Sequence, residues 1–203
     1  QLTFVESDWI GFGPMTWSGD IRVPFIENSE ASPVEVDLQV IMNNVDLNIP
    51  RYALEFNSLV GQVNYNYPIS IKASKITGSL FGRPVNISSE SDGLTSILSF
   101  DGSAGDRNIL DTLDLDNIEL FEGDFDFSSE LFIFKENDKS TRLKVVSDLV
   151  GLEVILPSDL YKAPEESVPL KVEIHFAPQY DEIQISYALL QSWFHMGERG
   201  LRG

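Results

Sequence analysis

The stretch Val34-Glu35-Val36-Asp37-Leu38-Gln39-Val40-Ile41-Met42 decides the fold class of this chain, because apolar residues occupy every second position. Glu35, Asp37 and Gln39 fill the positions between them. A period of two is that of a β-strand, whose successive side chains point to opposite faces of the sheet. The stretch therefore predicts a strand with one apolar and one polar face, as in an antiparallel sheet with one solvated side.

The same alternation recurs along the chain, at 54–56, 63–67, 69–73, 125–127, 143–145, 172–176 and 183–187. Turn-forming residues predict breaks between strands at Asn43-Asn44, Asp92-Gly93, 101–106 and 136–139, the last inside a hairpin from Phe132 to Val145. Only 108–113 and 191–196 resemble short helices, too short for a strand–helix–strand unit. The pattern therefore predicts an all-β protein with an antiparallel sheet and few short helices.

Composition limits the partners that this chain can have. It has 203 residues and a net charge of −18, which disfavours nucleic acid and anionic surfaces. It has no cysteine, and no apolar run approaches the roughly 20 residues that span a bilayer. We expect 1–203 to be a single segment of a longer or processed chain, with a possible internal seam near 102–106.

No motif in the chain predicts catalysis, a cofactor or a metal. His175 and His195 are the only histidines, and no Gly-x-Ser-x-Gly motif accompanies them. The acidic run from Asp111 to Asp126 lacks the spacing of a calcium loop, so no metal site is expected. Two alternatives stay open: a hydrolase with paired Asp or Glu residues, and a β-sandwich that recognises carbohydrate or protein through Trp9, Trp17 or Trp193.

Several phrases resemble one known family when they are taken in order. Leu59-Val60-Gly61-Gln62-Val63-Asn64-Tyr65 is similar to its Leu-x-Gly-x-Val-x-Tyr strand, and Leu80-Phe81-Gly82-Arg83-Pro84 to its Leu-Phe-Gly-x-Pro connection. Ser147-Asp148-Leu149-Val150-Gly151, then Leu156-Pro157, Lys162 and Arg199-Gly200, complete the series. Ser158-Asp159-Leu160-Tyr161 departs from the Pro-Leu-Gly of the pattern. Over 19–203 the chain thus resembles the AsmA-like proteins of the YhdP type.

The resemblance implies a non-enzymatic segment of a Gram-negative envelope protein that is anchored in the inner membrane and extends through the periplasm. Such proteins conduct phospholipid between the inner and outer membranes along an antiparallel sheet curled into an open groove. The expected partners are phospholipid acyl chains and the rest of the same long chain, with some self-association of this segment alone. The residues expected to line the groove are Val36, Leu38, Val40, Leu54, Phe56, Val63, Tyr65, Ile69, Ile71, Phe125, Phe127, Leu143 and Val145.

Overall fold

The computed structural model describes residues 9–23, 34–67, 70–92, 94–108, 120–134, 140–177, 179–197 and 200–202. The chain divides into two compact units. Unit 1 comprises Gln1–Leu98 and Phe132–Lys139, and unit 2 comprises Ser99–Leu131 and Ser140–Gly203. Both units consist of antiparallel strands, which confirms the predicted fold class.

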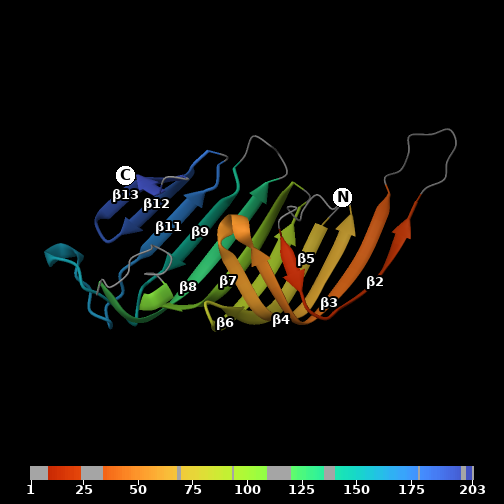
Figure 1. Cartoon of the computed structure of the whole chain (residues 1–203), viewed down its shortest axis with the longest axis horizontal. Coiled ribbons are helices and arrows are strands. Elements are labelled where there is room, and N and C mark those ends of the chain that lie inside the picture. Colours follow the sequence, from red (N-terminus) through yellow and green to blue (C-terminus); the bar gives the residue numbers. More distant parts are fainter. Residues whose placement is uncertain are drawn as a thin grey trace. The chain divides into compact units, whose positions relative to one another are not determined.

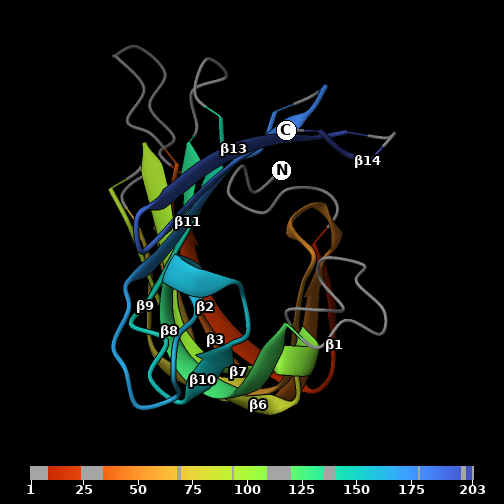
Figure 2. The same ribbon diagram turned by 90° about the vertical axis from the view of Figure 1, so that its left-hand side faces the viewer.

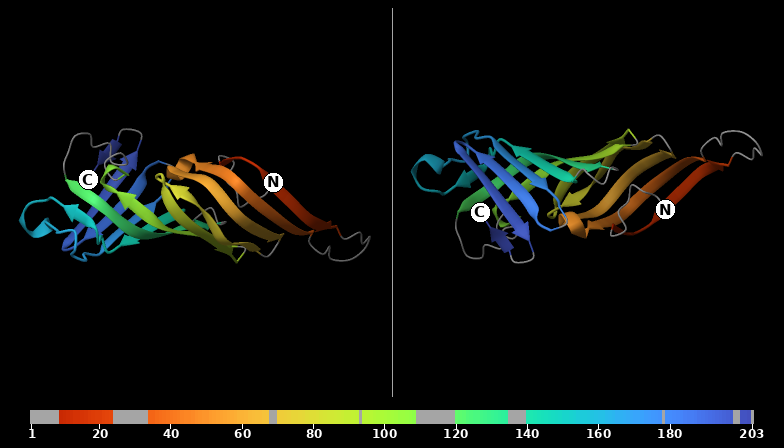
Figure 3. Two further views of the ribbon diagram at one scale, coloured as in Figure 1. Left: turned by 90° about the horizontal axis from the view of Figure 1, so that it is seen from below. Right: turned by 90° about the horizontal axis from the view of Figure 1, so that it is seen from above.

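Unit 1 is built mainly from antiparallel strands that lie side by side in one sheet. They are β1 (Ile10–Phe12), β2 (Met15–Arg22), β3 (Glu35–Ile49), β4 (Leu54–Tyr67), β5 (Ser70–Leu80) and β6 (Arg83–Ser91), with the 3₁₀ helix η1 (Pro50–Tyr52) between β3 and β4. Along β3, one edge pairs with β4, while the other pairs with β2 over Glu35–Met42 and with β1 beyond it. Figure 1 labels β2 to β6, Figure 2 labels β1, and Figure 3 shows the strands side by side in red to yellow.

The apolar alternation of unit 1 slips by one residue in the middle of three strands. In β3 the apolar positions are even up to Met42 and odd from Val45. A β-bulge with one extra residue lies at each slip, at Asn44 in β3, Ser58 in β4 and Lys75 in β5, and each of these residues has a positive φ. An extra residue cancels the slip, so the apolar side chains stay on one face throughout.

These bulges lie in neighbouring strands and form a line across the sheet, which we call the crease (Asn44, Ser58 and Lys75). Bulges bend a strand and increase its twist, and β3 and β4, in orange, curve along their length in Figure 2. The inner side of the bend is crowded. A Cβ atom on Gly61 would lie 2.9 Å from Cα of Ile76, and one on Gly78 would lie 2.6 Å from Cδ2 of Leu59. Glycine at these two positions lets neighbouring strands approach where the sheet bends.

Unit 2 is a second antiparallel series. β7 (Thr95–Gly105) and β8 (Phe121–Phe134) contribute residues to both units, and the other strands are β9 (Arg142–Ser147), β10 (Leu152–Val154), β11 (Leu170–His175), β12 (Asp181–Tyr187), β13 (Leu190–Gly197) and β14 (Gly200–Arg202). The 3₁₀ helix η2 (Ser158–Leu160) lies between β10 and β11. Within unit 2 the order is β8-β9-β11-β12-β13-β14, and β10 pairs with β8.

Three local predictions from sequence are wrong. Asn43-Asn44 is a bulge inside β3 rather than a turn, because the strand pairs on both sides of it. The stretch 101–106 was predicted to be a turn, but β7 continues to Gly105. The stretch 191–196 lies in strand β13, where pairing with β12 overrides its weak helical pattern. The turn predicted at 136–139 lies outside the described residues, and β8 and β9 on either side of it are neighbours.

Within the described ranges, no helix has the length and apolar character needed to cross a bilayer.

Candidate functional site

The inner face of β2, β3 and β4 is a continuous apolar surface in unit 1. Trp17 lies opposite Val40, which lies opposite Val63 in the next strand. One step along, Gly19, Leu38 and Tyr65 form a second row. We call this surface the open face and define it by Met15, Trp17, Ile21, Val36, Leu38, Val40, Met42 and Val63. At the described inward positions of these strands, no side chain carries a charge.

The outer face of the same strands is polar. Arg22 and Glu35 form an ion pair at 3.4 Å between β2 and β3. Gln62 donates a hydrogen bond of 2.9 Å to the side-chain oxygen of Asn64. The two faces therefore differ as the alternation predicts, with hydrogen-bonding groups in solvent and apolar groups on the inner side.

Exposure divides the inner face at the crease. On the side of the crease that ends at η1, Val45, Leu59 and Ile76 are buried, together with Phe56, whose exposed fraction is 0%. On the other side, Val36, Leu38 and Val40 are only half-buried, and the exposed fractions of Trp17 and Ile21 are 72% and 70%. A contiguous exposed apolar surface in a soluble domain usually marks a binding site. Unit 1 thus has a packed half, which supplies stability, and an open half, which can receive an apolar ligand.

Unit 2 repeats this division between an apolar and a charged face. On one face Val172 lies opposite Val145 and Ile185, and Ile174 lies opposite Leu143 and Ile183. On the β7–β8 part of the sheet, the rings of Phe100 and Phe127 meet edge to face with centroids 6.3 Å apart. Phe127, Leu143 and Ile183 are buried, and Val145 and Val172 are half-buried.

Glu173 lies at the centre of a group of charged side chains on the other face of unit 2. Its carboxylate lies 2.6 Å from Nζ of Lys171 and 3.4 Å from a guanidinium nitrogen of Arg142. The hydrogen bond from Lys171 lowers the pKa of Glu173, and the charges of Lys171, Arg142 and His175 act in the same direction against desolvation. Because the folded-state pKa lies below that of the unfolded chain, this carboxylate stabilises the fold above the unfolded-state pKa.

Glu173→Gln is therefore expected to lower the free energy of unfolding by about 1 kcal/mol at neutral pH. The loss should shrink as the pH falls through the folded-state pKa, since both proteins are then uncharged at this position. Urea unfolding at neutral pH and at about pH 3 measures the difference. An equal loss at both pH values would show that packing, and not charge, is responsible.

The phrase Ser147-Asp148-Leu149-Val150-Gly151 begins the connection between β9 and β11, and we call residues 148–168 of it, which include β10 and η2, the cap (Figure 2). Ser147 Oγ donates to the carbonyl of Asp126 at 2.6 Å and accepts from the Leu149 N–H at 2.9 Å. The Asp148 carboxylate accepts from the Val150 N–H at 3.1 Å. Gly151 has φ 98°, and a Cβ there would collide with the carbonyl oxygen of Asp124. Each of these residues thus has a local structural role in forming the turn.

Lys162 is buried inside the cap and is hydrogen-bonded to its backbone. Its exposed fraction is 0%, and Nζ donates to the carbonyls of Leu152 at 2.7 Å and Ala163 at 2.9 Å. Burial lowers the pKa of the Lys162 amine, while the carboxylates of Glu166, Asp148 and Glu165 oppose this by favouring its charged form. Leu149, Leu152 and Val154 are buried with it. The cap is therefore a structural element of unit 2.

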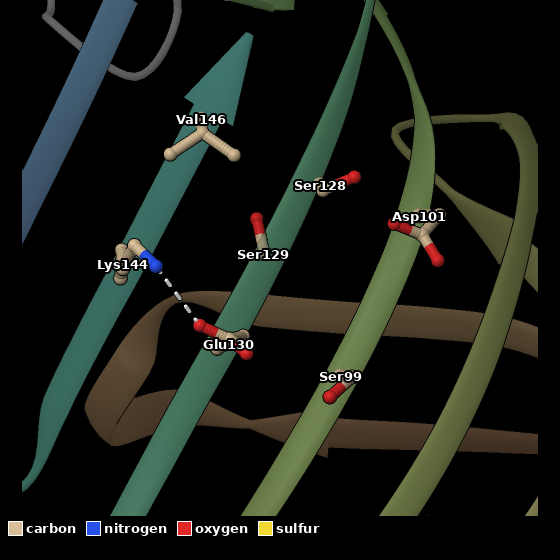
Figure 4. Close-up of a pocket in the computed structure, with 7 residues that line it drawn as sticks. All are labelled: Ser99, Asp101, Ser128, Ser129, Glu130, Lys144 and Val146. Carbon is tan, nitrogen blue, oxygen red and sulfur yellow. Dashed lines mark hydrogen bonds and ion pairs between the residues drawn. The ribbon is translucent and has the colours of Figure 1, made fainter.

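A hollow of about 250 Å³ lies on the polar side of β7, β8 and β9 (Figure 4). Its lining includes Asp101, Glu130 and Lys144, and Nζ of Lys144 lies 3.2 Å from a Glu130 oxygen. A glycosidase would use one carboxyl as a proton donor, kept protonated by burial. Neither carboxyl is buried, because Asp101 is exposed and the Glu130 side chain, paired with Lys144, is 42% exposed, so this hollow does not support the hydrolase alternative.

The residues expected from sequence to line a groove fall into distinct environments. Val36, Leu38, Val40 and Val63 lie on the open face, with buried Tyr65 beside them. Leu54, Phe56, Phe125, Phe127 and Leu143 are buried, and Val145 is half-buried. Ile71 lies opposite Tyr65 in β5, but its side chain is outside the described part, as is all of Ile69.

The sequence analysis missed the most exposed members of the open face, Trp17 and Ile21. The sequence suggests Trp17 only for carbohydrate or protein recognition, whereas it lies inside β2, opposite Val40. The signal that could have found it is the alternation of Met15, Trp17, Gly19 and Ile21. Trp193 lies on the charged face of unit 2 and is exposed. Its cross-strand neighbour in β12 is Gln184.

Carboxylates and histidines do not assemble a metal site among the residues that the structure describes. Glu122, Asp124 and Asp126 from the acidic run are exposed along β8, and the members between 111 and 119 lie outside the described residues.

Comparison with known proteins adds one finding. The sequence profile of the YhdP family, described as YhdP protein, matches residues 13–201. No curated protein and no solved structure matches the chain. The match covers nearly all of the chain, including the open face, the crease and the cap. This protein belongs to the YhdP family.

Proposed function

We propose that this chain is a non-enzymatic, lipid-binding segment of an envelope protein, and that it conducts phospholipid between the inner and outer membranes. The observation that carries the proposal is the open face, an uncharged apolar surface whose outermost side chains, Trp17 and Ile21, are exposed. Membership of the YhdP family supports it. The whole protein would be anchored in the inner membrane and extend through the periplasm.

The energetics of acyl chains suit such a surface. Each buried methylene contributes about 0.8 kcal/mol, in a bilayer or on any other fully covering apolar surface. Transfer between the two can therefore be close to neutral, as a conduit requires, and no tight headgroup pocket is needed. The eight residues of β2 span roughly 26 Å, enough for an extended acyl chain.

The rest of the same long chain is the second proposed partner. Among the strands that the structure describes, β2 pairs only with β3, so its outer edge is free to add another strand. In a separate segment, this edge and the open face would favour self-association, which light scattering with and without detergent would detect.

Val40→Asp is expected to reduce the phospholipid retained by the purified chain about tenfold or more, because a charge on the open face adds several kcal/mol to the cost of seating an acyl chain. Ile41→Asp is the matched control, since Ile41 is the next residue of β3, lies on the outer face and is exposed. Native mass spectrometry and phosphate analysis of extracted lipid measure the retained amount.

A second variant separates lipid binding from folding. Ile21 is so exposed that aspartate there should not disturb the fold, yet it lies on the open face. Ile21→Asp should lose lipid while keeping the far-ultraviolet circular dichroism of the wild type. Full lipid retention by both Val40→Asp and Ile21→Asp would exclude the open face as the binding surface.

One observation favours the alternative of a module that recognises carbohydrate or protein. Trp193 is 61% exposed on the charged face of unit 2. His195 lies two residues further along β13 on the same face, and its ring is 5.0 Å from the ring of Tyr180. Aromatic rings of this kind can stack on sugars or partner side chains. A glycan-array screen of the wild type and Trp193→Ala would identify such binding, and the two lipid variants should leave it unchanged.

A further inference from the structure

The turn between β12 and β13 in unit 2 presents leucine to solvent. It consists of Ala188 and Leu189, and the exposed fraction of Leu189 is 94%. Two-residue hairpin turns favour asparagine, aspartate and glycine, because they require a positive φ. Ala188 has φ 49°, a conformation that disfavours a non-glycine residue. Ala188 does not suit the turn, and Leu189 contributes little to packing, so folding alone does not explain this sequence.

Further apolar side chains lie at the same end of the sheet. Leu190 lies opposite Tyr187 and is 41% exposed. The Tyr187 hydroxyl donates to the Leu160 carbonyl at 3.0 Å, which holds the end of β12 against the cap. The next residue of the cap, Tyr161, is 50% exposed. We call Leu189, Leu190 and Tyr161 the apolar tip.

The surroundings of the apolar tip are negatively charged. The Tyr161 hydroxyl donates to Glu153 at 2.8 Å, and this hydrogen bond, with the charges of Glu153, Glu165 and Glu166, raises the pKa of Tyr161. Glu166 also raises the pKa of Tyr187, after the larger effect of burial. The Lys162 amine is buried and bonded to two backbone carbonyls, so it presents no cation at this surface, whereas Glu165 and Glu166 are exposed there.

We propose that the apolar tip is a docking surface for a polypeptide segment that carries lysine or arginine beside apolar side chains. Complementary charge around an apolar contact gives affinity and orientation. A second copy of this chain would bring the same carboxylates against each other, and an anionic bilayer would be repelled in the same way. This surface is separate from the open face and adds a protein partner to the proposed lipid-binding function.

The test uses the whole 203-residue chain and two synthetic peptides, one alternating lysine with leucine and the other glutamate with leucine. The lysine peptide is expected to bind saturably, to shift the amide resonances of 153–166 and 187–191, and to weaken as salt is added. Leu189→Asn should reduce its affinity at least tenfold. This substitution should preserve the fold, because asparagine suits a hairpin turn. Ile21→Asp, on the open face, should leave the affinity unchanged.

Four outcomes would overturn the proposal. The two peptides could bind equally, Leu189→Asn could bind as the wild type does, or the shifts could fall outside the apolar tip. Vesicles of zwitterionic lipid whose binding depends on Leu189 would also overturn it, in favour of a membrane contact. Retained phospholipid is measured in the same samples, so failure here is distinct from failure of the lipid-binding proposal.

Discussion

Phe56→Asp is expected to unfold unit 1, lowering the free energy of unfolding by about 5 kcal/mol or more. Phe56 has an exposed fraction of 0% and lies opposite Leu47 and Leu80 in the adjacent strands. Aspartate at this position would place an unpaired charge inside the packed half of the sheet. Denaturant unfolding and the loss of near-ultraviolet circular dichroism measure the effect.

Val60→Asp is the control for this prediction. Val60 belongs to the same strand, β4, but it is exposed on the outer face, so its replacement should change stability by only about 0.5 kcal/mol. The contrast matters for interpreting lipid assays, since lipid lost by Phe56→Asp would follow from unfolding. A stable, folded Phe56→Asp protein would contradict the assignment of this half of the face as packed core.

Lys162→Ala is expected to destabilise unit 2 by about 3–5 kcal/mol. The substitution removes a fully buried side chain and leaves the carbonyls of Leu152 and Ala163 without their donor. Lys162→Met keeps most of the stem, so it should recover the packing and lose only the hydrogen bonds. Thermal and urea unfolding of both variants separate the two contributions.

The pH dependence gives an independent check on Lys162. Its folded-state pKa is lowered, so the unfolded chain holds this proton more tightly than the folded protein does. The stability contribution of Lys162 therefore increases as the pH rises from the folded-state pKa toward the unfolded value of about 10.4, and is constant above it. Lys162→Met should lack this increase. If both proteins show the same alkaline profile, the amine does not titrate as its burial requires.

The strands could be predicted from sequence because their signal is local. Val36, Leu38 and Val40 alternate with polar residues, and the structure places them on one face of β3. The sequence also indicates the bulges at Asn44, Ser58 and Lys75, because the apolar alternation shifts by one residue at each of them. We interpreted the first as a turn, since an Asn-Asn pair suits either structure and only pairing with neighbouring strands decides between them.

The candidate site was harder to predict than the strands. Leu38 and Phe56 have the same pattern in sequence, yet one is half-buried and the other fully buried. The difference depends on the side of the crease on which a residue lies, and the crease is formed only when β3, β4 and β5 pair. The role of the Ser-Asp-Leu-x-Gly phrase could not be predicted either, because Gly151 meets Asp124 of β8 only in the folded chain.

The order of residues by itself determined an all-β chain, the two faces of each strand and the likeness to the YhdP family, since these depend on local periodicity and short phrases. Tertiary structure alone decided which apolar residues are core and which remain open to a ligand. The physical reason is that exposure depends on what lies across a face, and the same alternation that builds a strand is compatible with either environment.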